Sequence, residues 1–259
     1  LHAAQAQGAS KRQRKYSSCL SAWKMQFHNM KNKSNKDRKS PPHNPPLGKG
    51  GHRGGGIFIS LEGIEGTGKS TQAKLLSEHL SKKGYKTALT QEPGGTLISS
   101  QIRKVLLSTK HHKMDYLTEL LLYNAARVQH IKEKILPALR EGRVVITDRF
   151  SDSTVAYQGY GRGISLKLID SLDKTATGRM RPDITILLDL DVKTGLMRNK
   201  KIKKVDRLEL EDIKFHEKVR KGFLKLAAKE PVRIKIVKAS KGIDEVHREI
   251  VKIVEGVLK

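Results

Sequence analysis

The chain has 259 residues, of which 30% are charged and only one, Cys19, is a cysteine. A single cysteine excludes an intramolecular disulfide framework and a zinc site built from several cysteines. The formal net charge of +26 favours anionic partners such as nucleotides or RNA, but says nothing of the fold. No apolar run is long enough to cross a bilayer, so we expect a soluble, cytoplasmic protein without membrane contact.

Residues 1–55 differ in composition from the rest of the chain. They hold twelve of the 52 Lys and Arg residues and one of the 26 Asp and Glu residues, and they show no run of spaced aliphatic residues. Because such a segment cannot bury a core, we predict a basic, disordered tail with a non-specific attraction for nucleic acid. The chain opens with Leu, and the residues leave open whether this tail is native or added sequence.

From residue 56 onward, short aliphatic runs alternate with longer amphipathic stretches. Strands are predicted at residues 57–61, 86–90, 144–147, 184–190 and 233–237, and helices at residues 70–83, 117–139 and 244–258. This alternation predicts one α/β domain over residues 56–259, with a parallel sheet covered by helices on both faces. Ligands of such folds gather at the carboxyl ends of the strands.

The stretch GIEGTGKS lies between the first predicted strand and the first predicted helix. It matches the P-loop pattern G-x-x-x-x-G-K-[ST], whose backbone amides surround nucleotide phosphates at the start of a helix. Lys69 is expected to reach the β- and γ-phosphates, and Ser70 to offer its hydroxyl to Mg²⁺. The predicted ATP-binding residues are Gly63, Ile64, Glu65, Gly66, Thr67, Gly68, Lys69, Ser70 and Thr71.

Asp148 directly follows the aliphatic run VVIT. P-loop proteins place a second carboxylate beside Mg²⁺ at the end of another strand, so Ser70 and Asp148 form the predicted metal site. The alternative for Asp148 is a carboxylate that caps a helix. The P-loop leaves the reaction itself open, because motor ATPases, GTPases and kinases all share it.

Five motifs in order resemble those of bacterial thymidylate kinases, from about residue 57 to the carboxyl end. They are FISLEGIEGTGKST, QEPGG, YNAARVQ, DRFSDSTVAYQGYGRG and RPDITILLDLD. The resemblance implies a P-loop NTPase fold with a small mobile lid, a homodimer, and ATP- and Mg²⁺-dependent phosphorylation of thymidine monophosphate (dTMP) to thymidine diphosphate, for dTTP synthesis. Two alternatives stay open: a kinase for another nucleoside monophosphate, and a basic nucleic-acid-binding protein with a regulatory P-loop domain.

The resemblance also implies residues that hold dTMP. Arg149 and Arg103 would bind the acceptor phosphate, since guanidinium groups suit phosphate oxygens. Tyr123 would stack on the base, and Arg127, one helical turn later, would meet a thymine carbonyl. The remaining implied contacts are Glu65 at the sugar 3′-hydroxyl, Glu92 beside a cis Pro93 near the acceptor, Thr154 and Gln158 at the thymine ring, and Tyr157 at the sugar 2′ position.

The lid is expected over about residues 193–209. In the bacterial class whose P-loop lacks an Arg, as here with Gly66, the lid supplies a catalytic Arg. The predicted catalytic set is therefore Lys69, Asp148, Arg149 and the lid residue Arg198. The lid offers further cations, and the sequence leaves open which of them neutralises the transferred phosphoryl group: Lys200, Lys201, Lys203, Lys204 and Arg207.

Overall fold

The computed structural model describes residues 55–201 and 206–258, without the side chains of residues 200 and 201. Residues 1–54 of the predicted tail, with Cys19, lie outside the described residues, as do Lys203 and Lys204 of the predicted lid. No helix within the described ranges combines the length and the hydrophobicity that a membrane span needs.

Within these ranges, five parallel strands form one sheet in the order β2-β3-β1-β4-β5. The strands are β1 (Ile57–Glu62), β2 (Thr87–Gln91), β3 (Val144–Asp148), β4 (Ile184–Asp189) and β5 (Ile234–Lys238). The central strand β1 is an almost continuous apolar run because helices bury both of its faces. Each predicted strand is confirmed. Most of the strand ends differ from the predicted ones by a single residue.

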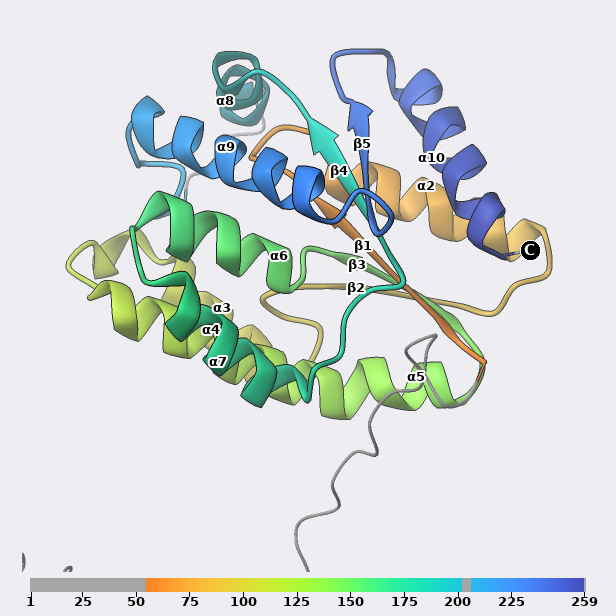
Figure 1. Cartoon of the computed structure of the whole chain (residues 1–259), viewed down its shortest axis with the longest axis horizontal. Helices are drawn as coiled ribbons and strands as arrows, with labels where there is room; N and C mark the ends of the chain where they lie inside the picture. The colour runs from red at the N-terminus through yellow and green to blue at the C-terminus, as the bar shows by residue number, and fades with distance from the viewer. Residues whose placement is uncertain (1–54, 202–205, 259) are drawn as a thin grey trace, which may run out of the picture. The chain divides into compact units, whose positions relative to one another are not determined.

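Helices connect the strands and form the two outer layers of the domain (Figure 1). They are α2 (Lys69–Lys82), α3 (Leu97–Leu107), α4 (Tyr116–His130), α5 (Leu136–Arg140), α6 (Ser151–Thr154), α7 (Leu166–Thr177), α8 (Val192–Lys201), α9 (Ile213–Lys229) and α10 (Ile243–Leu258), with short turns η1 (Thr109–His111), η2 (Ile131–Ile135) and η3 (Val155–Gly161). The helix predicted over residues 117–139 corresponds to α4, the π-helical turn η2 and α5.

Side chains that alternate along β1 build the two halves of the core. Ile59 and Leu61 pack with apolar residues of α2 and α10 on one face of the sheet. Phe58 points the other way and packs against Phe150 and the segment from η2 to α5. On this second face α9 and η3 add a third apolar cluster over β4 and β5. The predicted parallel sheet with helices on both faces is confirmed.

The carboxyl ends of three neighbouring strands bring the sequence motifs to one edge of the sheet. The P-loop follows β1, the Glu92-Pro93 pair with its cis peptide bond follows β2, and Arg149 follows β3. Backbone hydrogen bonds join these ends, from Arg149 N to Leu61 O (2.9 Å) and from Glu92 N to Asp148 O (2.9 Å). Motifs that lie up to a hundred residues apart in the sequence therefore meet at the carboxyl ends of the strands, where α/β folds bind ligands.

Candidate active site

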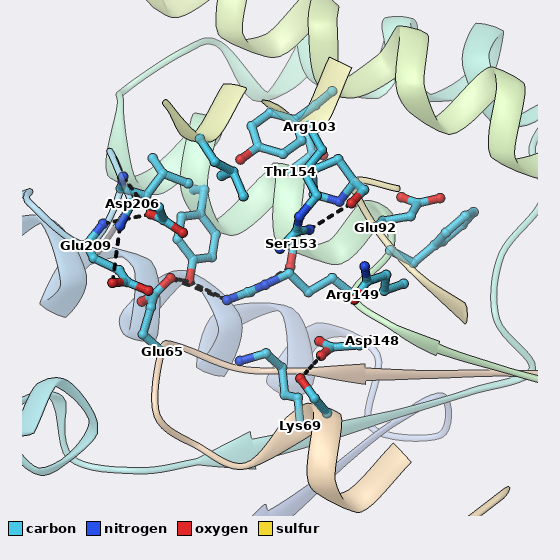
Figure 2. A pocket seen from close by; sticks show the side chains of 18 of the residues that line it. Glu65, Lys69, Glu92, Arg103, Asp148, Arg149, Ser153, Thr154, Asp206 and Glu209 are labelled. Carbon is cyan, nitrogen blue, oxygen red and sulfur yellow. Dashed lines mark hydrogen bonds and ion pairs between the residues drawn. The ribbon is translucent and has the colours of Figure 1, made fainter. Parts of the chain in front are cut away.

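A cavity of about 400 Å³ opens at this edge of the sheet (Figure 2). Its walls come from the P-loop, the ends of β2 and β3, the helices α3 and α4, the turn η3, and the loop before α9. The predicted site residues that line it are Glu65, Gly66, Gly68, Lys69, Ser70, Thr71, Glu92, Arg103, Tyr123, Arg127, Asp148, Arg149, Thr154, Tyr157 and Gln158. The motifs that are predicted to bind the donor phosphates and the acceptor thus share one cavity.

The P-loop is held in an anion-binding shape by its own side chains. Gly66 and Gly68 have φ values of 71° and 88°, a left-handed conformation that glycine adopts without steric cost. Thr67 Oγ1 and Lys69 Nζ both donate to the carbonyl oxygen of Ile64, at 2.9 and 2.7 Å. Helix α2 begins with no side-chain cap and no acidic residue in its first turn, so its first amides are left for a phosphate.

The Lys69 ammonium is buried and lies close to the charge of Arg149. Burial and the neighbouring charge of Arg149 lower the pKa of Lys69 to about 8, although Asp148 and Glu65 oppose the shift. Lys69 therefore begins to lose its proton just above neutral pH when no phosphate is nearby.

Ser70 and Asp148 lie together, as the predicted metal site requires. Ser70 Oγ donates a hydrogen bond to Asp148 Oδ2, which joins the start of α2 to the end of β3 (Figure 2). A hydroxyl and a carboxylate oxygen are donors that Mg²⁺ accepts, with nucleotide phosphates and water as further ligands. The residues present therefore fit the metal.

Arg149 lies at the centre of the cavity in a left-handed backbone conformation, with φ 72°. Its guanidinium donates to Gly63 O (2.9 Å) and Ser153 Oγ (3.1 Å), and also to Tyr157 Oη (3.0 Å) and Glu65 Oε1 (3.3 Å). A residue other than glycine in this conformation costs on the order of 1–3 kcal/mol, which the surrounding contacts must offset. Arg149 thus joins the P-loop to the acceptor motif.

Glu62 supports this turn, and sequence analysis missed it. Its carboxylate accepts from the backbone N of Phe150 (2.7 Å) and from Ser153 Oγ (2.5 Å), on the two sides of the Arg149 turn. Burial and the nearby Asp152 raise the pKa of Glu62 to about 8. The signal in the sequence was a Glu at the end of a buried strand, where an unpaired carboxylate would be costly.

Three predicted substrate-binding residues form one buried network. Arg127 is 2% exposed, and its guanidinium donates to Glu92 Oε2 (2.8 Å) and Thr154 Oγ1 (2.8 Å). Burial alone would raise the pKa of Glu92, but Arg127 and a hydrogen bond with His130 outweigh it and lower that pKa. Glu92 is therefore a carboxylate that holds Arg127 in place at the cavity wall.

Three further residues that are predicted to bind the substrate have contacts of their own. Gln158 Nε2 donates to the buried Glu119 Oε1 (2.8 Å), and Arg103 donates to Pro93 O (2.7 Å). Tyr123 lines the cavity, packed against the apolar cluster of α9 and η3.

Of the predicted lid cations, the structure describes the side chains of Arg198 and Arg207, and neither of them lines the cavity. Arg198 donates to Ala239 O (2.9 Å), and Arg207 is buried, where it donates to Leu106 O (3.1 Å) and pairs with Glu119 (2.5 Å). The described lid residues that line the cavity are Asn199, Asp206, Leu208 and Glu209. Asp206 and Glu209 lie on the same side as Glu65 (Figure 2). The catalytic role of Arg198 therefore stays a prediction.

Helix α8, which contains the described first part of the predicted lid, lies directly on the P-loop. A Cβ atom at Gly66 would overlap the carbonyl oxygen of Gly195, and a Cβ atom at Gly195 would lie 2.6 Å from the carbonyl oxygen of Glu65. Two glycines therefore allow the two backbones to touch. The same contact explains why the P-loop carries no side chain at Gly66.

Comparison with known proteins identifies the family. A family model described as thymidylate kinase matches residues 61–250. The chain belongs to the thymidylate kinase family. It is thus an ATP-dependent nucleoside monophosphate kinase that phosphorylates dTMP to thymidine diphosphate in dTTP biosynthesis. The resemblance and the activity expected from the sequence motifs are confirmed.

The alignments with individual relatives cover nearly the whole length of those relatives. The thymidylate kinase of Geotalea daltonii is 49% identical over 208 residues, 78% of this chain and 97% of that protein. That of Pelobacter propionicus is 48% identical over 202 residues, 76% of this chain and 92% of that protein. The crystal structure of thymidylate kinase from Ehrlichia chaffeensis is similar with a TM-score of 0.65 and 39% identity, covering 78% of this chain and 99% of that one.

The lowered pKa of Lys69 predicts a pH-dependent affinity for ATP. As the pH rises through about 8, Lys69 of this thymidylate kinase loses its charge, so the affinity for ATP should fall. Titration calorimetry between about pH 7 and pH 10 measures the dissociation constant, with Lys69→Arg as the variant that stays charged. Glu62 titrates in the same range. A fall that persists unchanged in Lys69→Arg would assign the effect to Glu62 and contradict the prediction.

The contact between Gly66 and Gly195 predicts that a methyl group at residue 195 impairs catalysis. Gly195→Ala must push α8 away from the P-loop, and displacements near 1 Å cost up to about a hundredfold in rate. Steady-state kinetics should show kcat/KM lowered by about tenfold or more. Gly256→Ala is the matched control, because Gly256 lies in α10 with open space around it. The control should keep its activity and gain roughly 0.5–1 kcal/mol of stability. Equal activity in both variants would contradict the prediction that the contact between α8 and the P-loop matters for catalysis.

Proposed function

We propose that the P-loop holds the phosphates of ATP while dTMP occupies the half of the cavity between Glu92, Tyr123 and Tyr157. The observation that carries this proposal is the position of Arg149, whose guanidinium contacts Gly63 of the P-loop and Ser153 and Tyr157 of the acceptor motif. A cation at this point lies between donor and acceptor phosphates, where negative charge must be neutralised during transfer.

Each wall of the cavity has a separate task in this proposal. Lys69 and the first amides of α2 bind the donor phosphates. Arg149 and Arg103 bind the acceptor phosphate, and Arg127 meets a thymine carbonyl with Thr154 and Gln158 beside it. Glu65 accepts from the sugar 3′-hydroxyl, and the Tyr157 ring occupies the space of a ribose 2′-hydroxyl. The transfer itself needs positioning and charge neutralisation, without a covalent enzyme intermediate.

Mg²⁺ belongs to the same proposal, held by Ser70 and Asp148, whose side chains already contact each other. When bound, the ion neutralises charge on the donor phosphates. The lid, over about residues 193–209, closes against water by the movement of α8, and Arg198 supplies the catalytic cation after a change of its contact with Ala239. The domain limits, residues 1–55 for the tail and 56–259 for the kinase domain, and a cytoplasmic location stay predictions.

A comparison of nucleoside monophosphates as acceptors tests this assignment of the cavity. The full chain, with ATP and Mg²⁺, should form ADP fastest with dTMP, compared with the monophosphates of deoxyuridine, uridine, adenosine and guanosine. Arg149→Ala should lower kcat/KM by about 10²–10³-fold, the cost of removing one preorganised charge from a site of this kind. Arg140→Ala, at the exposed end of α5, is the control and should leave the rate unchanged. Preference for a purine acceptor would contradict the proposed base contacts.

A homodimer is the second part of the proposal. Helices α3 and α4 pack against each other and expose several large apolar side chains: Leu97, Ile98, Val105, Leu117 and Leu121, with Leu97 78% exposed. An apolar face of this kind marks a contact with another protein surface. A second copy of this chain is the proposed partner, since the family resemblance implies a homodimer that would bury such a face on both subunits.

Sedimentation velocity tests the dimer. The wild-type chain should sediment as a dimer, and Leu97→Asp combined with Ile98→Asp should shift it to a monomer, because two buried charges without partners disfavour the contact. Val232→Asp replaces an apolar residue that is 86% exposed but lies before β5, away from this face, and should leave the dimer intact. A wild-type monomer at micromolar concentration would contradict the proposal.

A further inference from the structure

His216 is a fully buried polar residue among aromatic side chains. It lies in the first turn of α9, and its ring packs against that of Phe215 at 5.4 Å between centroids. The neighbouring inward residues of α9 are apolar, among them Val219 and Phe223. A phenyl ring would pack in such apolar surroundings without any polar partner. A buried imidazole, by contrast, costs free energy unless its ring nitrogens have hydrogen-bond partners.

The partner of this imidazole is the carboxylate of the P-loop. His216 Nδ1 lies 3.2 Å from Glu65 Oε2. The other oxygen, Oε1, accepts from Tyr157 Oη (2.5 Å) and from Arg149 Nη2 (3.3 Å). Within the described part of the chain, Glu65 Oε2 and both ring nitrogens of His216 are buried and have no hydrogen-bond partner, so the 3.2 Å approach of Nδ1 is the polar contact open to Oε2. Each carboxylate oxygen is therefore held from a different element, by η3 and the Arg149 turn on one side and by α9 on the other.

The electrostatics of Glu65 agree with this arrangement. Burial by itself would raise the pKa of Glu65, but the contact with His216 and the charges of Arg149 and Lys69 outweigh it and lower the pKa to about 2. Glu65 is therefore ionised at all working pH values and acts only as an acceptor. Because an ionised carboxylate only accepts, the tautomer that suits this contact is the one with the proton on Nδ1.

We propose that His216 is a positioning residue for substrate recognition, which acts through Glu65. The Nδ1–H group fixes the rotation of the carboxylate, so that a remaining lone pair faces the sugar of the bound nucleotide. This inference rests on the proposed role of Glu65 as acceptor for the 3′-hydroxyl of dTMP. Without the imidazole, the carboxylate keeps its charge but rotates about its last bond, and the preference for a 3′-hydroxyl falls.

Two substitutions at residue 216 separate positioning from core packing. His216→Asn keeps an N–H donor close to the place of Nδ1, whereas His216→Phe keeps the ring and removes the donor. The measured quantity is the ratio of kcat/KM for dTMP to kcat/KM for 3′-deoxythymidine monophosphate, with ATP as donor and the full chain as enzyme. His216→Phe should lower this ratio roughly tenfold, the size of one hydrogen bond, and His216→Asn should restore most of it.

The outcomes distinguish this inference from the role of Glu65. If the wild-type enzyme shows a high ratio and His216→Phe lowers kcat/KM for both nucleotides equally, His216 only fills the core and the inference is wrong. If the wild-type enzyme does not distinguish the two nucleotides, the proposed role of Glu65 is wrong, and the inference about His216, which depends on that role, is wrong as well. A ratio that falls in His216→Phe and recovers in His216→Asn supports both.

A measurement on the wild-type protein does not depend on the folding of a variant. Nitrogen-15 NMR of the histidine side chains distinguishes a ring protonated on Nδ1 from one protonated on Nε2 alone, and the His216→Asn spectrum assigns the signal. We expect Nδ1 of His216 to carry a proton in the free enzyme and in the dTMP complex. A ring protonated only on Nε2 would overturn the inference, because it could not donate to Glu65.

Discussion

The contact between Arg149 and the P-loop is the interaction on which the site depends. The guanidinium donates to Gly63 O of the P-loop on one side and to Ser153 and Tyr157 on the other, so that one planar cation joins two walls of the cavity. The left-handed backbone of this residue directs its side chain back across the sheet edge. Glu62 holds the neighbouring backbone, which links the conformation of Arg149 to the central strand.

Buried charges at the cavity are balanced by partners from distant parts of the chain. Lys69, Arg127 and Arg149 are surrounded by Glu62, Glu65, Glu92 and Asp148. The charges of Glu65, Glu92 and Asp148 favour the charged form of these cations in the free protein. The strongly basic composition of the chain does not reveal this balance, because most of the Lys residues that the structure describes are exposed, whereas these acids are buried or half-buried.

The lid differs from the expectation based on its composition. Its sequence is rich in cations, yet Arg207 binds Glu119 and Leu106, and the charged residues of this segment that the structure describes at the cavity are the acids Asp206 and Glu209. Contact between α8 and the P-loop is made through backbone at Gly66 and Gly195 rather than through charge. A charged segment close to a phosphate site can therefore serve packing, and its charges must be assigned one at a time.

The sequence by itself determined the alternating strands and helices and the P-loop. These follow from local patterns: buried strands have aliphatic runs, and a phosphate loop needs glycines and a lysine at fixed spacing. Only the tertiary structure decided that Arg207 pairs with Glu119, that Glu62 supports Arg149, and that His216 contacts Glu65. Partners such as His216 and Glu65 lie about 150 residues apart, and no local pattern records a contact that arises only when the strand ends meet.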